Sequence, residues 1–157
     1  MGKVLKNRVK NRVIVSQDNG DFADLKRLAE SCLEGYILSA EKIAERSRKK
    51  DFTMLFSRED LVRRPNGFIV GYCRRQRMHI WLFGVLKKMR GRGIGRALLR
   101  SFHSVAIRKG YKKVDTITFN KYPRKIILAL KLGYRITKTN FIAQKRDTAI
   151  FMEKSLR

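Results

Sequence analysis

A glycine-rich turn between two regular patterns constrains this chain most. The stretch from Leu82 to Phe102 reads LFGVLKKMRGRGIGRALLRSF: an apolar run typical of a strand, then the turn, then apolar residues at helical spacing. The first turn of a helix leaves backbone N–H groups unpaired at the positive end of the helix dipole, and glycines before it let an anion approach the backbone. The pattern therefore predicts an α/β fold that holds an anionic ligand at this turn.

Two familiar phosphate-binding motifs do not describe the turn. It lacks the Gly-Lys-Ser/Thr ending of a P-loop. The segment RGRGIG at 90–95 also has the wrong glycine spacing for a dinucleotide-binding fingerprint. What remains is a convergence of backbone donors with the guanidinium groups of Arg90, Arg92 and Arg96.

The charge balance points to a polyanionic partner. The 157 residues carry a net charge of +25. Between Leu61 and Arg146 there are 23 Lys or Arg residues and a single acid, Asp115, whereas from Asp18 to Asp60 there are 8 basic and 10 acidic residues. A field of this kind concentrates RNA, DNA or anionic headgroups, and the alternative is a merely solvated, highly charged surface. We expect RNA or DNA, or a protein bound to it, as the partner of a monomer or homodimer.

Hydrophobic periodicity and capping residues indicate strands and helices without a linker or an internal repeat. Most strands are joined by hairpins, and helices are inserted around the glycine turn, so we expect a single mixed α/β (α+β) domain over 1–157. Strands are expected at 9–16, 52–56, 68–77, 79–85, 114–119, 134–138 and 148–154, and helices at 21–33, 40–49, from the end of the turn at 95 to about 108, and at 123–132.

Composition excludes several classes of protein. No apolar run approaches the ~18–20 residues of a membrane span. The basic segment MGKVLKNRVKNRVIV at the start lacks the apolar core of a signal peptide. The two cysteines, Cys32 and Cys73, have neither the spacing of metal ligands nor the density of a disulfide framework. We therefore expect no metal site, and a reducing, cytoplasmic setting.

The segment VLKKMRGRGIGRALL at 85–99 resembles the central motif of the GNAT superfamily of N-acetyltransferases: a strand, then Arg/Gln-x-x-Gly-x-Gly/Ala, then a helix. Arg90, Gly93 and Gly95 stand at its three defining positions. IWLFGV at 80–85 resembles the strand before this motif, and LALKLGY at 128–134 resembles a later helix-to-strand ending of the family. The order of the expected elements also matches, so the resemblance implies a GNAT-like fold whose central, mostly antiparallel, splayed sheet is flanked by about four helices.

The resemblance implies an acyltransferase that binds acetyl-coenzyme A at the turn. Backbone amides of the turn would bind the pyrophosphate, and the edge of the preceding strand would pair with the pantetheine arm as an added strand does. Basic side chains and Asn120 would contact other parts of the cofactor, although Arg124 and Lys125 fit a solvated surface at least as well. The residues expected to bind the cofactor are Phe83, Gly84, Val85, Arg90, Gly91, Arg92, Gly93, Ile94, Gly95, Arg96, Asn120 and Lys125.

Acetyl transfer to an amine needs a base for the amine proton, a donor to the thioester oxygen and a proton for the leaving thiolate. The glutamate base common in the family is missing here, and His79, at the head of the strand before the turn, is the candidate base; its alternative is an exposed strand residue. The tyrosine acid of the family falls on Ala129, which leaves Tyr122 as a candidate catalytic residue that is equally consistent with packing. The backbone N–H of Val85 is expected to polarise the carbonyl.

The acceptor site is the least determined part. In the family the first two helices and their loop form one wall of it, here CLEGYILSA at 32–40, so Glu34 and Tyr36 are expected to contact a cationic amine. Three functions stay open: acetyl transfer to an amine on a nucleic acid or a nucleic-acid-associated protein, transfer to a small amine or a protein N-terminus, and nucleic-acid binding without catalysis. The missing glutamate and tyrosine favour the last, the intact turn favours transfer, and neither the acceptor nor the acyl group is identified.

Overall fold

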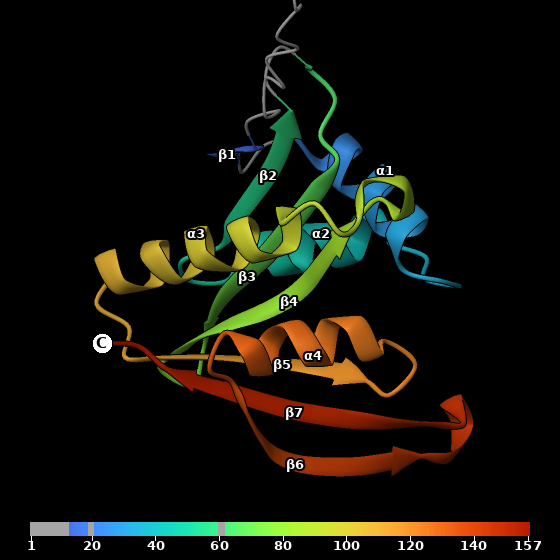
Figure 1. Cartoon of the computed structure of the whole chain (residues 1–157), viewed down its shortest axis with the longest axis vertical. Helices are drawn as coiled ribbons and strands as arrows, with labels where there is room; N and C mark the ends of the chain where they lie inside the picture. The colour runs from blue at the N-terminus through green and yellow to red at the C-terminus, as the bar shows by residue number, and fades with distance from the viewer. Residues whose placement is uncertain (1–12, 19–20, 60–61) are drawn as a thin grey trace, which may run out of the picture.

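The chain folds around a seven-stranded sheet with four α-helices, in a computed structural model that describes residues 13–18, 21–59 and 62–157 (Figure 1). The strand order is β1-β2-β3-β4-β5-β7-β6, and only β4 and β5 are parallel neighbours. The mixed, mostly antiparallel fold expected from the sequence is therefore confirmed. The elements are β1 (Val13–Gln17), α1 (Phe22–Cys32), α2 (Ala40–Ser47), β2 (Thr53–Glu59), β3 (Gly67–Arg74), β4 (Arg77–Val85), η1 (Lys87–Met89), α3 (Ile94–Arg108), β5 (Lys113–Phe119), α4 (Pro123–Lys131), β6 (Arg135–Ile142), η2 (Ala143–Lys145) and β7 (Asp147–Ser155).

Alternating side chains of the central strands supply two hydrophobic cores on opposite faces of the sheet. On one face, Leu55 and Ile69 pack with α3 and α4. On the other face, Met54 and Phe56 pack with α1 and α2. In Figure 1, α3 and α4 lie on the viewer's side of the strands. The sheet thus keeps α1 and α2 on one side and the helix that follows the glycine turn on the other.

The first two helices begin where the sequence provides capping side chains. Asp21 accepts a hydrogen bond from the Asp24 amide (3.0 Å) at the start of α1, and Ser39 accepts one from the Lys42 amide (3.2 Å) at the start of α2. By contrast, α3 follows Gly93 and has no side-chain cap among the described residues. None of the helices in that part of the chain is long and apolar enough to cross a membrane.

Two hairpins differ from the expected strand boundaries. The expected strands at 68–77 and 79–85 are separated instead at Arg75 and Gln76, whose φ angles are 50° and 61°. Such turns match the twist of the flanking strands, but neither residue is the glycine or asparagine that usually marks them. β6 continues to Ile142, beyond the expected end at 138, because its backbone pairs with β7 as far as Ile142. Most of its side chains are exposed. The expected strand residues 9–12 lie outside the described part of the chain.

β4 and β5 separate soon after they meet. They pair only at Met78–Val114, His79–Asp115 and Ile80–Thr116. β4 then continues to Val85, while β5 stays paired with β7, and Figure 1 shows the two strands diverging. The splay implied by the resemblance is present, and among the described residues no strand pairs with the β5-facing edge of β4 from Trp81 onward.

Candidate active site

The glycine turn lies between η1 and α3, as the sequence predicts. Gly91 and Gly93 have φ angles of +78° and +83°, a left-handed backbone that other residues rarely adopt. The space beside both is open, since an added Cβ would meet nothing within 4 Å. Arg90 Nε donates to the Val85 carbonyl (3.1 Å) and so fastens the turn to the end of β4. The start of α3, which no side chain of the described residues caps, therefore lies beside open space.

A cavity of about 710 Å³, here named the turn cavity, lies between this turn, the end of β4 and the start of α4. No carboxylate of the described residues lines it. Its cationic lining residues are Arg90, Arg96, Lys121, Arg124, Lys125 and Lys131. Its large apolar lining residues are Leu33, Phe83, Val85, Met89, Ile94 and Leu128. The cavity thus combines a positively charged wall with an apolar one.

Most of the residues predicted to bind the cofactor line the turn cavity; these are Phe83, Gly84, Val85, Arg90, Gly91, Gly93, Ile94, Gly95, Arg96 and Lys125. Two predicted residues do not line it. Arg92 instead forms an ion pair with Glu59 of β2, at 3.4 Å. Asn120 is exposed, and its backbone N–H donates to the Thr148 carbonyl (3.0 Å). Arg92 therefore links the turn to β2.

A second cavity of about 930 Å³, here named the histidine cavity, lies next to the first. Glu34, Tyr36 and His79, three of the predicted catalytic and substrate-binding residues, all line it. Four residues line both cavities: Leu33, Lys121, Tyr122 and Lys125. The two cavities therefore meet at the start of α4, where β4 and β5 have separated.

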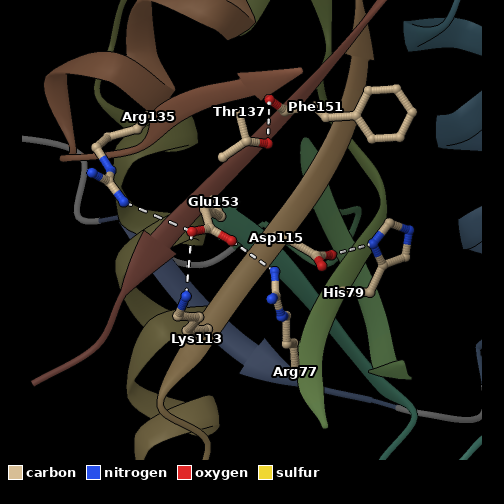
Figure 2. Close-up of polar contacts among 8 residues, drawn as sticks. All are labelled: Arg77, His79, Lys113, Asp115, Arg135, Thr137, Phe151 and Glu153. Carbon is tan, nitrogen blue, oxygen red and sulfur yellow. Dashed lines mark hydrogen bonds and ion pairs between the residues drawn. The ribbon is translucent and has the colours of Figure 1, made fainter. Parts of the chain in front are cut away.

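His79 is buried, with 5% of its surface exposed, so the alternative of an exposed strand residue is wrong. The parallel register of β4 and β5 sets it opposite Asp115, and its Nδ1 lies 2.5 Å from Asp115 Oδ1 (Figure 2). A carboxylate at Nδ1 favours the tautomer that carries its proton there, which leaves Nε2 able to accept one. Sequence analysis did not assign Asp115 a role, although its isolation among basic residues was a usable signal.

The neighbouring carboxylate, Glu153, is occupied elsewhere. It stands opposite Asp115 in the β5–β7 register, and Figure 2 shows it among three cations. The Glu153 carboxylate lies 2.7 Å from Arg77, 3.3 Å from Lys113 and 3.8 Å from Arg135, one cation on each of β4, β5 and β6. Glu153 thus joins four strands, whereas Asp115 contacts the histidine.

Three buried polar atoms have no hydrogen-bond partner among the described residues: Arg46 Nε, Thr118 Oγ1 and Asp147 Oδ2. All three residues line the histidine cavity. Buried polar atoms in folded proteins are nearly always paired, so these atoms suit a polar ligand. Asp147 uses its other oxygen for the Thr148 amide (2.8 Å), which leaves Oδ2 as an acceptor. Sequence analysis missed Asp147, because nothing in the sequence near it indicates a cavity.

The histidine cavity is basic, although the predicted acceptor wall lies in a nearly neutral segment. Its carboxylates are Glu34 and Asp147. Its cations are Lys42, Arg46, Lys49, Arg74, Lys121, Lys125 and Lys145. Three of these come from α2 and the residues after it, and the others come from distant parts of the chain that the fold brings to the same cavity. The Arg46 guanidinium also lies 5.7 Å from the ring centroids of both Tyr72 and Trp81.

The start of α4 carries the predicted catalytic residue Tyr122. It precedes Pro123 as the N-cap residue, and Lys121 Nζ lies 5.2 Å from its ring centroid. Ala129 is buried further along the same helix. Lys125, between them, is half-buried as a residue, and burial lowers the pKa of its ammonium to about 8. Two candidate proton donors therefore stand where the cavities meet.

Comparisons with known proteins agree on one family. The family model described as "Acetyltransferase (GNAT) domain" matches residues 51–136. No curated protein sequence matches the chain. Among solved structures, the ribosomal-protein-S18-alanine N-acetyltransferase from Escherichia coli has a TM-score of 0.79 at 14% identity, covering 92% of this chain and 94% of that one.

Two further solved structures show the same fold. Ard1 from Thermoplasma volcanium has a TM-score of 0.79 at 21% identity, covering 92% of this chain and 98% of that one. A GNAT family acetyltransferase from Elizabethkingia anophelis with acetyl-CoA bound has a TM-score of 0.75 at 20% identity, with the same coverage. Because the family model spans more than half of the sequence, the chain belongs to the GNAT acetyltransferase family: it is an acyltransferase, and acetyl-coenzyme A is its cofactor.

Proposed function

We propose that this enzyme transfers an acetyl group to an amine carried by a nucleic acid, or by a protein bound to one. The observation that supports this most is the lining of the histidine cavity, where seven cations face two carboxylates, in a chain of net charge +25. A free cationic amine or a protein N-terminus would be repelled by such a wall. In an amine flanked by phosphates, the phosphates can contact the cations of the cavity while the amine contacts Asp147 Oδ2, which has no hydrogen-bond partner among the described residues. Because the cations line the cavity itself, a nucleic acid is the favoured carrier.

The turn cavity fits acetyl-coenzyme A. Its cations and the uncapped start of α3 suit a pyrophosphate, and the open space beside Gly91 and Gly93 admits one. The unpaired edge of β4, at 83–85, suits amides that pair with a strand. When bound, the cofactor supplies the thioester whose acetyl group is transferred. In this proposal the backbone of 90–96, with Arg90 and Arg96, holds the phosphates, and the Val85 N–H donates to the acetyl oxygen.

The histidine cavity supplies the groups that act on the amine. Asp147 Oδ2 holds the incoming ammonium, with Glu34 and Tyr36 on the wall formed by the first two helices. His79 Nε2 takes the amine proton, directly or through a water molecule, and Asp115 keeps the ring in the required tautomer. Asp115 is therefore a positioning residue and His79 a catalytic one.

Labelled acetyl transfer to matched acceptors tests this function. Nuclease-treated enzyme is given radiolabelled acetyl-coenzyme A with an RNA oligonucleotide that carries an aminoalkyl group, with the same aminoalkyl group alone, or with a lysine-rich peptide. We expect kcat/KM for the oligonucleotide to exceed the other two and to fall steeply with salt, since each phosphate contact adds about 0.7 to the log–log slope for single strands. Equal rates for the free amine and the oligonucleotide would contradict the proposal.

A triple variant and its control locate the acceptor. Lys49→Gln, Arg74→Gln and Lys145→Gln together remove three cations of the histidine cavity and should lower that slope by about 2. Arg100→Gln removes an exposed cation of α3 that lines neither cavity and should leave catalysis of the same oligonucleotide within about twofold. A loss of activity that is the same for both variants would place the nucleic acid outside the cavity.

A further inference from the structure

Lys125 occupies a place that no other cation of the described residues shares. It lines the turn cavity, the histidine cavity and a small cavity of about 10 Å³ between α4 and the sheet. Of the four residues common to the two large cavities, Leu33 has no proton to donate and Lys121 is exposed. Tyr122 and Lys125 are both half-buried, and Lys121 is exposed, so Tyr122 and Lys125 are the less exposed proton-bearing side chains at the junction.

The surroundings of the Lys125 ammonium differ from those of a surface lysine. Its Nζ lies 5.5 Å from the ring centroid of Phe83, a residue of the turn cavity. Within the described part of the chain, no carboxylate forms an ion pair with it. The small cavity that it lines also contains Thr118, whose buried hydroxyl has no partner. The Lys125 ammonium thus lies near an aromatic ring of the turn cavity, in a residue that also lines the histidine cavity.

The helical register connects Lys125 with the position of the missing tyrosine. Ala129 stands four residues later, which is the same face of α4 one turn further on, and both residues line the small cavity. The space beside Ala129 is the small cavity of about 10 Å³, which is room for about one water molecule. A lysine from the preceding turn is long enough to bring its ammonium toward that space.

From this geometry, we propose that Lys125 donates the proton to the sulfur of coenzyme A as the thiol departs. The inference rests on the acetyl transfer stated above but not on the identity of the acceptor. The amine nitrogen forms a bond to the acetyl carbon and the carbon–sulfur bond breaks. The ammonium held at Asp147 first loses one proton to solvent, which frees the nitrogen lone pair. His79 then takes the second proton as the amine attacks, and the Lys125 ammonium gives its own proton to the sulfur. Lys125 then regains a proton from solvent and His79 releases one, so the protons balance.

The acidity of Lys125 suits this step. Burial lowers the pKa of its ammonium to about 8, close to the value of about 8.5 for an ordinary protein thiol. The position of Lys125 in the first turn of α4, near the positive end of the helix dipole, acts in the same direction. Proton transfer between groups of matched pKa near the working pH is the favourable case for general acid catalysis.

Substitutions at Lys125 distinguish two roles for this residue, as a proton donor to the sulfur or as a ligand of the cofactor phosphates. With any accepted amine at saturation, we expect Lys125→Met to lower kcat about 100-fold and to change the Kd for acetyl-coenzyme A less than about threefold. If the Kd rises by that same factor and saturating cofactor restores kcat, Lys125 binds phosphate and the proposal fails. Arg100→Gln, at an exposed residue that lines neither large cavity, is the control and should leave kcat within about twofold. A large loss in Tyr122→Phe with little loss in Lys125→Met would assign the role to Tyr122 and overturn the proposal.

The pH profile gives a second readout. A general acid must be protonated, so kcat of the wild-type enzyme should fall above pH about 8. Lys125→Arg keeps its charge at all relevant pH values, so this alkaline fall should disappear. An unchanged alkaline limb in Lys125→Arg would overturn the assignment. The other titratable or charged groups that line the three cavities are Glu34, Lys42, Arg46, Lys49, Arg74, His79, Arg90, Arg96, Lys121, Tyr122, Arg124, Lys131, Lys145, Asp147, Cys32, Tyr36, Tyr72, Cys73 and Tyr134.

A titration without turnover makes the result independent of the acceptor. The thiolate absorbance of enzyme-bound coenzyme A is followed against pH in the wild type, Lys125→Met and Lys125→Arg. A neighbouring cation stabilises the thiolate, so we expect Lys125→Met to raise the pKa of the bound thiol by about 1 or more, and Lys125→Arg to leave it near the wild-type value. The same thiol pKa in all three proteins would refute the contact, even if no amine acceptor had been found.

Discussion

The pair of His79 and Asp115 allows a prediction whose size follows from the structure. Asp115→Asn keeps the shape of the side chain but removes the charge that faces His79 Nδ1 at 2.5 Å. A hydrogen bond to a charged group contributes about 1.5–3 kcal/mol, and about 1.4 kcal/mol corresponds to a factor of ten in rate. Since 26% of the Asp115 side chain is exposed, water screens part of this interaction. We therefore expect kcat to fall about 10- to 30-fold.

A double-mutant cycle on kcat checks this prediction. His79→Ala should lower kcat about 100-fold or more, because it removes the base. If Asp115 acts by positioning His79, Asp115→Asn should have almost no further effect once His79 is alanine. The same fold-loss in both backgrounds would refute the positioning role.

Glu153→Gln is the matched control for that cycle. It removes a carboxylate in register with Asp115 on the adjacent strand, but one that contacts Arg77, Lys113 and Arg135 and lines neither large cavity. It should lower the free energy of unfolding by about 1–2 kcal/mol and leave kcat within about twofold. A loss of kcat in this variant equal to that of Asp115→Asn would show that both act through the sheet.

Four other changes have defined outcomes. Gly93→Ala places a Cβ in open space, but the φ of +83° at this residue costs an alanine about 1–2 kcal/mol. Calorimetry should therefore show acetyl-coenzyme A binding that is weaker by about tenfold. Unchanged binding would mean that this backbone does not position the cofactor. Asp147→Asn should raise KM for the amine acceptor at least about fivefold without changing KM for acetyl-coenzyme A, and the opposite split would remove Asp147 from the acceptor site. Burial lowers the pKa of His103 from 6.5 to about 4, so between these pH values the unfolded chain binds more protons than the folded one. The free energy of unfolding should therefore fall by about 3 kcal/mol as the pH drops from 6.5 to 4, which urea unfolding can measure. In Tyr134→Phe, which removes the 2.6 Å hydrogen bond to His103, the protein should already be about 1–3 kcal/mol less stable at neutral pH.

What the sequence predicts well here depends on near neighbours in the chain. The glycine turn, the start of α3 that follows it and the N-terminal caps of α1 and α2 are set by a few adjacent residues, and the structure contains all of them. The turn at Arg75 and Gln76 is also local, but it uses residues that carry no turn signal. Local pattern therefore predicted the elements better than their ends.

The parts that sequence reasoning missed depend on distant register. Asp115 contacts His79 because a parallel pairing sets residues 36 apart side by side, and periodicity does not specify that register. Asp147 reaches the histidine cavity from the start of β7. Lys125 was expected at the cofactor, but its place at all three cavities, from the first turn of α4, depends on the fold. A count of charges along the chain indicated a nearly neutral acceptor wall, whereas the fold gathers cations from four separate segments around it.

The short parallel pairing of β4 with β5, here called the seam, also has a consequence for the order in which the site forms during folding. Strands β2, β3 and β4 follow one another in antiparallel order, and contacts between such near neighbours cost little loop-closure entropy. The seam joins them to β5, β7 and β6 through three residue pairs, and each large cavity takes its lining from both sides of it. A chain in which only the first side has formed lacks α4, which carries Tyr122 and Lys125, and so has neither large cavity complete. Both cavities are therefore properties of the finished sheet, and neither exists before its two sides have joined.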